Sequence, residues 1–366
     1  MNAPQSTNKK YFTCGPTELY PVVREFMLEA LDKKLPSISH RSKDFEIIVK
    51  YTVDELKKLM GIPDGFMIFF SSAGTECMER ILENLVEDCS FHFVNGSFSE
   101  RFYKTAKELK KNPLIHQVDY GKGFNFDEVN IPEKTELICI TQNETSTGVA
   151  VPMKKISELK DKYPDKLIAI DVVTSAPYQK IDFEKVDIAF FSVQKGFGLP
   201  AGLGVTILRE SCINKTISMN ELNYNIGSYN NFIDAAGNYK KNQTTVTPNM
   251  LGIYMLGKIA NYLNTIGIDK IRFETEEKAR LFYDYFFTRK DMKLFVEDPF
   301  DRSKTIIVVD CFDKQSAVKR YLADNGFYVS SGYGKFAANH IRIANFPMHT
   351  IEDVTKIIEL LDVKEF

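Results

Sequence analysis

Short apolar runs that recur between stretches of helical hydrophobic spacing constrain the fold more than any other feature of this sequence. The runs are FMIFF (66–70), FHFV (91–94), LICIT (137–141), LIAID (167–171), IAFFS (188–192) and VTIL (205–208). Apolar runs of this length are typical of strands buried on both faces, and their alternation with helices is typical of a parallel sheet. The sequence therefore predicts an α/β fold in which helices sandwich a mostly parallel sheet.

One helix can be predicted together with its end. Hydrophobic residues recur at spacings of three and four, and a glycine follows where the helix would stop: Phe45, Val49, Val53, Leu56, Met60 and then Gly61. We expect this helix to contribute core packing and no chemistry.

The pattern changes after about residue 255. Helical stretches then lead to TIIVVD, a helix around SAVKRYLADNG, FYVSS, HIRIA and a last helix, which predicts a smaller α+β domain. A length of 366 residues also favours two domains. We predict a large domain over 15–258 and a small domain over 259–366 together with 1–14. The helix in TPNMLGIYMLGKIANYL and the turn-rich YFTCGPTELYP fit either domain.

Composition excludes several classes of partner. The 47 basic and 49 acidic side chains nearly cancel, without a long Lys/Arg block, so nucleic acid and membrane surfaces are poor candidates. No apolar run approaches the roughly 20 residues of a membrane span, and the polar start MNAPQSTNKK lacks the apolar stretch of a signal peptide. We expect a cytoplasmic protein. Its six cysteines show neither CxxC pairs nor metal spacing, which favours reduced thiols and no metal site.

Lys195 is the first candidate for chemistry. It follows an apolar strand in FFSVQKGFGLPAGLGV, at a strand end in a glycine-rich turn, where loops build sites in α/β sheets. A solvated surface lysine is the alternative. GFGLPAG does not match the G-x-G-x-x-G spacing of dinucleotide-binding turns.

Asp171 ends the run LIAID, and its carboxylate is suited to keep a pyridinium nitrogen protonated. A helix cap or a turn residue is the alternative for an aspartate here. An acid and a lysine on two successive strands favour a cofactor site, because a Schiff-base lysine and the partner of the ring nitrogen must share one sheet edge.

Two further strand ends carry polar residues. In FFSSAGTECMER an apolar strand breaks into a turn before a helix, which makes either an anion site at the helix N-terminus or a plain capped turn. In LICITQNETSTGV the residues Asn143, Glu144 and Thr145 could reach a cofactor ring oxygen or simply form a turn.

Taken together, these motifs resemble the class V, fold-type I pyridoxal-phosphate aminotransferases. Within that family, SHRSKDF (39–45), GPTELYP, NETSTGV and RIANFPM resemble the phosphoserine branch, and the resemblance spans nearly the whole chain. It implies a mostly parallel, mixed seven-stranded type of sheet in a large domain, a small C-terminal α+β domain, and a homodimer.

The resemblance also implies roles for single residues around the cofactor. Lys195 would form the Schiff base with pyridoxal 5′-phosphate, and Asp171 would bind the ring nitrogen. The remaining predicted cofactor contacts are Gln194 to the phosphate, Thr145 to the ring's phenolic oxygen, and Ala73, Gly74 and Thr75 as the phosphate cradle. Thr247, in a Thr-Pro pair, would complete the phosphate site of the other subunit.

For the substrate, the resemblance implies that Arg342 binds the α-carboxylate and that His40 and Arg41 bind the substrate's own phosphate. Some positions depart from the family pattern. Phe98 stands where the family usually stacks a Trp on the cofactor ring, SAGTE replaces a glycine-rich cradle, and Val246 replaces an Asn. Lys335-Phe336 stands where a His-Arg pair is expected, so Lys335 is the one phosphate-binding cation predicted there.

The implied reaction is transfer of an amino group between L-glutamate and 3-phosphohydroxypyruvate, giving phosphoserine and 2-oxoglutarate. The alternatives are another class V aminotransferase that uses glyoxylate or pyruvate with alanine, serine or aspartate, and a non-catalytic pyridoxal-phosphate binding protein. A cysteine desulfurase is disfavoured because no cysteine lies near Arg342 in the sequence.

Overall fold

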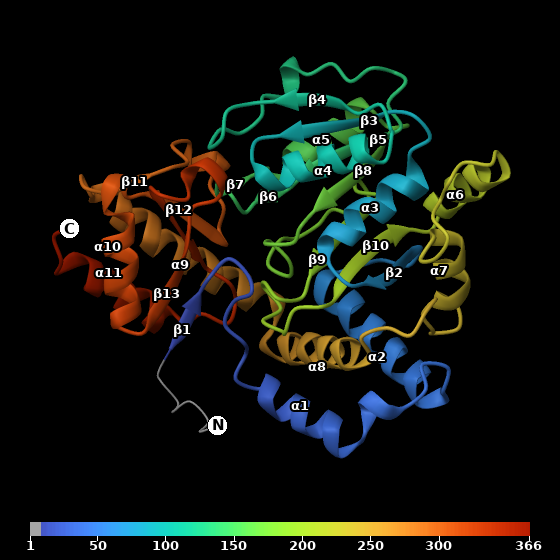
Figure 1. Ribbon diagram of the computed structural model, residues 1–366, viewed down its shortest axis with the longest axis horizontal. Coiled ribbons are helices and arrows are strands. Elements are labelled where there is room, and N and C mark those ends of the chain that lie inside the picture. The colour runs from blue at the N-terminus through green and yellow to red at the C-terminus, as the bar shows by residue number, and fades with distance from the viewer. Residues whose placement is uncertain (1–8) are drawn as a thin grey trace.

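The computed structural model describes residues 9–366, which form a seven-stranded sheet, a five-stranded sheet and a short two-stranded sheet of β6 (Asn143–Glu144) and β7 (Val149–Ala150), all surrounded by helices (Figure 1). The larger sheet has seven strands in the order β2-β10-β9-β8-β5-β3-β4. Their bounds are β2 Phe66–Ser71, β3 Ser90–Val94, β4 Leu114–Gln117, β5 Leu137–Thr141, β8 Leu167–Asp171, β9 Ile188–Ser192 and β10 Gly204–Arg209. Only β10 runs antiparallel to its neighbours. The predicted α/β fold with a mostly parallel sheet is confirmed.

The six predicted apolar runs all form strands of this sheet, whereas β4 was not predicted. Its sequence LIHQ alternates half-buried and exposed residues, because β4 lies at the edge of the sheet. β4 therefore lacks the continuous apolar run by which the other six strands were predicted, including β2 at the opposite edge of the sheet.

Helices cover both faces of the seven-stranded sheet (Figure 1). They are α2 Lys43–Met60, α3 Gly74–Leu85, α4 Ser97–Glu108, α5 Met153–Lys162, α6 Cys212–Glu221, α7 Phe232–Tyr239 and α8 Met250–Ile266, and α1 Val23–Asp32 packs on α8. The helix predicted between Phe45 and Met60 is α2. It begins at Ser42, whose Oγ accepts the Phe45 N–H, and ends at Gly61, whose φ of 65° is left-handed. Its apolar face packs against α8.

The second sheet has five strands in the order β1-β13-β14-β12-β11. They are β1 Lys10–Phe12, β13 Phe327–Ser331, β14 His340–Ala344, β12 Ile306–Asp310 and β11 Lys293–Leu294, and the helices α9 Ile268–Thr288, α10 Gln315–Asp324 and α11 Ile351–Asp362 pack on them. The elements predicted after residue 255 are therefore present. The limits of the two predicted domains stay a prediction, and residues 1–8 of the predicted small domain lie outside the described residues.

The N-terminal segment joins the two sheets. β1 pairs in parallel with β13 of the five-stranded sheet. The chain then crosses toward the seven-stranded sheet, where Tyr20 N donates to the carbonyl of Gly198 at 3.3 Å. YFTCGPTELYP therefore contacts both halves of the molecule.

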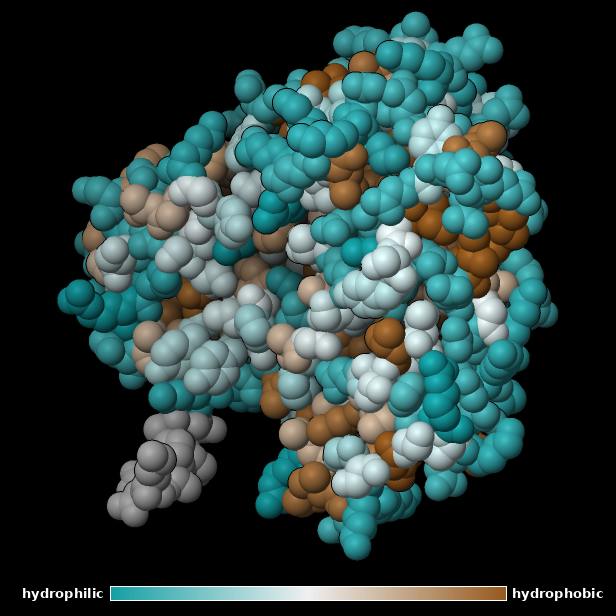
Figure 2. Space-filling model, turned by 45° about the vertical axis from the view of Figure 1, so that its right-hand side comes forward, coloured by the Kyte–Doolittle hydropathy of each residue, from teal (hydrophilic) through white to brown (hydrophobic). Residues whose placement is uncertain are grey.

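The surface drawn in Figure 2 is mostly hydrophilic and carries several hydrophobic patches. Large apolar side chains that are exposed include Leu31 on α1 and, on the segment between α6 and α8, Tyr229 and Val246. Exposed apolar patches are typical of contact sites when they are contiguous. All six cysteines are buried free thiols, and none of the helices in residues 9–366 is long and apolar enough to cross a membrane.

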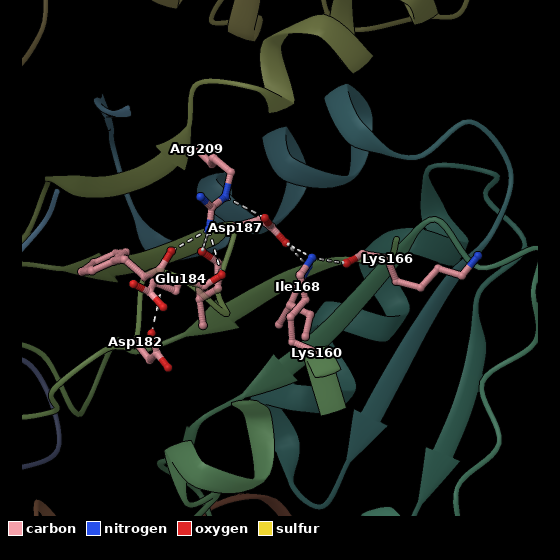
Figure 3. Close-up of polar contacts among 9 residues, drawn as sticks. Lys160, Lys166, Ile168, Asp182, Glu184, Asp187 and Arg209 are labelled. Atoms are coloured by element: carbon pink, nitrogen blue, oxygen red, sulfur yellow. Dashed lines mark hydrogen bonds and ion pairs between the residues drawn. The ribbon is translucent and has the colours of Figure 1, made fainter. Parts of the chain in front are cut away.

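A buried ion-pair network fixes one end of the central strands (Figure 3). The Asp187 carboxylate, just before β9, accepts hydrogen bonds from Arg209 Nε at 2.8 Å, Lys160 Nζ at 3.0 Å and Ile168 N at 3.0 Å. These partners come from β10, α5 and β8. The network thus sets the relative positions of β8, β9 and β10 at the edge opposite to the ends of β8 and β9.

Candidate active site

The ends of β8 and β9 bring an acid and a lysine to one edge of the seven-stranded sheet. Asp171 is the last residue of β8 and pairs with Phe190 of β9. Ser192 ends β9, and Lys195 follows in the next turn. Since parallel neighbouring strands end at the same edge, both side chains start from the edge where α/β proteins bind ligands.

Lys195 lies against the N-terminal segment. Its Nζ donates a hydrogen bond to the backbone carbonyl of Cys14. Burial lowers the pKa of the Lys195 ammonium, and the charge of Arg342 acts in the same direction, whereas the charge of Asp171 opposes it. A lowered pKa brings the neutral, nucleophilic amine closer to physiological pH.

Asp171 is almost fully buried, at 3% exposure. Burial raises the pKa of its carboxyl group to about 7, and the charge of Glu144 adds to this rise. Within residues 9–366 it accepts one hydrogen bond, from Val173 N to Oδ1 at 2.8 Å, which leaves Oδ2 for a further donor. A cationic N–H donor would favour the charged carboxylate and lower this pKa.

The predicted phosphate cradle lies at the N-terminus of α3. Gly74 N donates to Ser192 Oγ at 2.7 Å, so the cradle is attached to the end of β9, but this N–H is used within the protein. The side chain of Thr75 is exposed. In the described part of the chain, the buried Oε1 of Gln194 lacks a hydrogen-bond partner. A helix N-terminus with an exposed hydroxyl suits an anion.

Thr145, Arg342 and Phe98 surround the same edge. Arg342 of β14 is 9% exposed, and its Nη1 donates to the carbonyl of Thr145 at 3.2 Å while Nε donates to Ser331 O at 2.8 Å. Thr145 Oγ1 lies 3.0 Å from Thr174 Oγ1. Arg342 thereby connects the five-stranded sheet to the polar turn that follows β5.

Tyr333, which we did not predict, joins two of these residues. Its ring centroid lies 5.3 Å from that of Phe98 and 5.3 Å from the guanidinium carbon of Arg342. Its side chain is 42% exposed. Gly332 and Gly334 flank Tyr333, and this SGYG pattern is typical of a turn. Nothing in the sequence indicated that the turn faces α4.

Three predicted residues form a separate group. His40 Nδ1 lies 3.1 Å from Thr247 Oγ1. Arg41 donates to Gln243 Oε1, Thr244 O and Thr245 O at 2.9, 2.7 and 3.0 Å, and also to Asn238 Oδ1 at 3.1 Å. No hydrogen bond or ion pair joins His40, Arg41 or Thr247 to Lys195, Asp171 or Arg342 in residues 9–366. Arg41 therefore holds the loop that carries Thr247.

A cavity of about 260 Å³ separates this loop from the cradle. Its walls include Ser72 and Glu76 beside the cradle, Tyr229, and the Thr247-Pro248 pair. Glu76 accepts hydrogen bonds from the Ser72 backbone and hydroxyl at 2.7 and 2.6 Å, which orders the turn between β2 and α3.

Lys335 is exposed, and its Nζ lies 5.0 Å above the ring of Tyr120 and 5.1 Å from that of Phe336. Phe336 stacks on His340 at 4.5 Å between ring centroids. Phe336, at the second position of the expected His-Arg pair, thus contributes to an aromatic cluster with Tyr120, Phe295 and His340. One cation, Lys335, is present at this pair of positions.

Chemically, this edge combines a lysine of lowered pKa, a buried acid, an arginine and an anion-binding turn. Such a set can attach a carbonyl compound covalently, stabilise a cationic heterocycle and hold a carboxylate. Burial raises the pKa of the Cys14 thiol, although Arg342 and Lys195 lower it in part, which disfavours the nucleophilic thiolate form.

The family model described as "Aminotransferase class-V" matches residues 12–356. Over 357 residues the chain is 27% identical to a phosphoserine aminotransferase from Rhodococcus jostii, which covers 96% of this chain and 94% of that protein.

Among solved structures, a phosphoserine aminotransferase from Cytophaga hutchinsonii superposes with a TM-score of 0.96 at 44% identity, covering 98% of this chain and 99% of the other. A ureidoglycine–glyoxylate aminotransferase from Bacillus subtilis superposes with a TM-score of 0.82 at 19% identity, covering 99% and 94% of the two chains. This second likeness concerns the fold alone.

Proposed function

Because this chain belongs to the class-V aminotransferase family, we propose that it transfers the amino group of L-glutamate to 3-phosphohydroxypyruvate, forming phosphoserine and 2-oxoglutarate. The observation that carries the substrate assignment is the 44% identity, over nearly the whole chain, to a phosphoserine aminotransferase. The resemblance of SHRSKDF and RIANFPM to the same branch supports it.

The cofactor in this proposal is pyridoxal 5′-phosphate, and the residues at the site fit it. Within residues 9–366 no group donates a hydrogen bond to Asp171 Oδ2, which suits the N–H of a protonated pyridine ring. Lys195 has a lowered pKa, as covalent attachment to an aldehyde requires. The exposed Thr75 hydroxyl and the N-terminus of α3 suit the phosphate.

When bound, pyridoxal phosphate supplies an electron-withdrawing ring that stabilises negative charge at the substrate's α-carbon. Asp171 keeps the ring nitrogen protonated. The Lys195 amine would take the proton from the α-carbon as a general base and return it as a general acid. Phe98 would offer its ring for stacking on the cofactor, and Arg342 would bind the α-carboxylate and so orient the α-carbon toward Lys195.

The distal phosphate of the substrate is assigned to His40, Arg41 and Lys335. In this chain His40 and Arg41 lie close to Thr247 and apart from Lys195. We therefore propose that His40, Arg41 and Thr247 act on the active site of a second copy in a homodimer. The exposed Tyr229 and Val246 near Thr247 support a contact there.

A second candidate has one observation in its favour. Lys335-Phe336 replaces the expected His-Arg pair, and Phe336 packs in an aromatic cluster. The alternative is therefore a class-V aminotransferase for an unphosphorylated oxo acid such as pyruvate or glyoxylate.

The test is an assay of the purified protein with glutamate, alanine and serine as donors and 3-phosphohydroxypyruvate, pyruvate and glyoxylate as acceptors. We expect kcat/KM to be highest for glutamate with 3-phosphohydroxypyruvate. A preference for pyruvate or glyoxylate would refute the phosphorylated substrate while leaving the aminotransferase in place. Borohydride reduction should fix the cofactor to Lys195, and its absence from that residue would refute the whole proposal.

A further inference from the structure

Glu144 is a carboxylate buried at 0% exposure in β6 (Asn143–Glu144), directly after β5. Its carboxylate accepts hydrogen bonds from the N–H groups of Phe98, Ser99 and Ser146 at 3.1, 2.8 and 3.1 Å. The hydroxyls of Ser99 and Ser146 donate to it at 2.9 and 2.7 Å. These five donors are all uncharged, so the charge of Glu144 is held by dipoles rather than by an ion pair.

The arrangement follows from the start of α4. Gly96 is the N-cap and has no side-chain oxygen to accept the N–H groups of the first helical turn. Glu144 accepts the N–H groups of Phe98 and Ser99 instead. Gly96 is required for this approach, because a β-carbon there would overlap the Glu144 side chain and lie 2.6 Å from Ser146 Oγ. The positive end of the α4 dipole also favours a carboxylate at this place.

Glu144 therefore touches the backbone of Phe98 and precedes Thr145. A second bond strengthens this connection, since Ser97 N donates to Ser146 Oγ at 2.9 Å. The turn after β5 and the turn before α4 are thus held as one unit. The charge of Glu144 also acts on Asp171, as one of the causes that raise the pKa of that carboxyl group.

We propose that Glu144 is a positioning residue for the cofactor site: it fixes Phe98 through the first turn of α4, and it adds a negative charge just after the end of β5, where Thr141 pairs with Asp171. This inference rests on the proposed binding of pyridoxal phosphate. A fixed Phe98 ring keeps its stacking surface in place when the cofactor leaves. The negative charge of Glu144, added to that of Asp171, favours keeping a proton between the Asp171 carboxylate and the ring nitrogen.

The test compares Glu144→Gln with Glu136→Gln. Glu136 is the control because its carboxylate also accepts three backbone N–H groups, from Glu87, Asp88 and Cys89, at 2.8–2.9 Å, and it differs from Glu144 in its ion pair with Lys215 at 2.7 Å. Both variants should lose stability. Only Glu144→Gln should speed the release of pyridoxal phosphate from the holoenzyme, by about two- to tenfold, which is the range expected for a loosened aromatic stack.

Two readouts do not depend on activity. Amide hydrogen exchange at Phe98 and Ser99 should be faster in Glu144→Gln and unchanged in Glu136→Gln. In the cofactor-free protein, the pKa of Asp171, followed by carbon NMR of labelled aspartate, should fall in Glu144→Gln because a negative neighbour is removed. A purely structural role for Glu144 would leave that pKa where it is.

Ser146→Ala provides a second variant if Glu144→Gln does not fold. It removes one donor and keeps the charge, so exchange at Ser97 should quicken while the pKa of Asp171 stays at its wild-type value. The inference is overturned if Glu144→Gln matches Glu136→Gln in cofactor release and in the Asp171 pKa. Wild-type protein that binds no pyridoxal phosphate would instead refute the proposed function.

Discussion

The Nζ of Lys195 donates a hydrogen bond to the backbone carbonyl of Cys14, a residue 181 positions earlier in the chain. Cys14 is itself tied to β13, since its N–H donates to Ser330 Oγ at 3.0 Å. The lysine is therefore held by a segment that belongs in part to the five-stranded sheet. This contact gives the amine a defined acceptor whenever it is not bonded to a cofactor.

Gly15→Ala should block this arrangement. A β-carbon at Gly15 would overlap the Lys195 side chain, and φ is +116°. We expect a loss of stability of about 1–3 kcal/mol from backbone strain and, in addition, at least a tenfold lower yield of cofactor trapped on Lys195 by borohydride. Gly267→Ala is the control, because its φ is +91° but open space surrounds the added carbon. Equal trapping in the two variants would show that Gly15 acts through strain alone.

Asp171→Asn should stabilise the cofactor-free protein at high pH while impairing amino transfer. Burial raises the pKa of Asp171 from its ordinary value to about 7. The folded state therefore keeps a proton that the unfolded state has lost, and stability falls as pH rises from about 4 to about 7. Asparagine escapes this cost, so at pH 8 the variant should be more stable by up to about 4 kcal/mol.

Urea unfolding of both cofactor-free proteins between pH 5 and pH 8 measures this difference. The difference in free energy of unfolding between Asp171→Asn and the wild type should become smaller as pH falls. Stopped-flow mixing of the holoenzymes with glutamate should show a much slower half-reaction for Asp171→Asn. Two stability curves that run parallel across this pH range would contradict the raised pKa.

Thr247 should act on the cofactor site of a partner subunit. Thr247→Val keeps the size of the side chain and removes the hydroxyl, so affinity for pyridoxal phosphate should fall by roughly tenfold, the equivalent of about 1.4 kcal/mol. Lys195→Ala should be inactive. Mixed and reassembled, the two variants should form active sites that bind pyridoxal phosphate with wild-type affinity, because one hybrid site combines an intact Lys195 with the partner's intact threonine. Mixing that restores nothing would place Thr247 in its own subunit's site.

Arg41→Ala should lower kcat/KM for 3-phosphohydroxypyruvate by about ten- to a hundredfold, as expected for a lost charge-assisted hydrogen bond, and should affect pyruvate little. Arg41 also holds the loop that carries Thr247, so Gln243→Ala is the necessary control. It removes one acceptor of Arg41 from that loop and keeps the cation. If Gln243→Ala reproduces the effect, Arg41 only orders the loop and the phosphate assignment fails.

Local sequence patterns determined the secondary structure of this protein to a large extent. The six apolar runs were predictable as strands because a strand buried in a sheet is a continuous apolar run, which can be recognised within about five residues. α2 was predictable with its end because Gly61 adopts the left-handed conformation that stops a helix. The family motifs also indicated Lys195 and Asp171, since each lies at the end of its own strand.

Only the tertiary structure decided which residues meet at the site. Lys195 meets Cys14, Glu144 caps a helix that begins 47 positions earlier at Ser97, and Tyr333 approaches Phe98. Each of these pairs joins side chains or backbone groups from different elements, and sequence spacing says nothing about how such elements pack. Burial acts in the same way, because the pKa values of Asp171 and Lys195 shift through desolvation that the whole fold creates. The chain alone shows which groups could act, whereas the packing of two sheets sets their contacts and their charge.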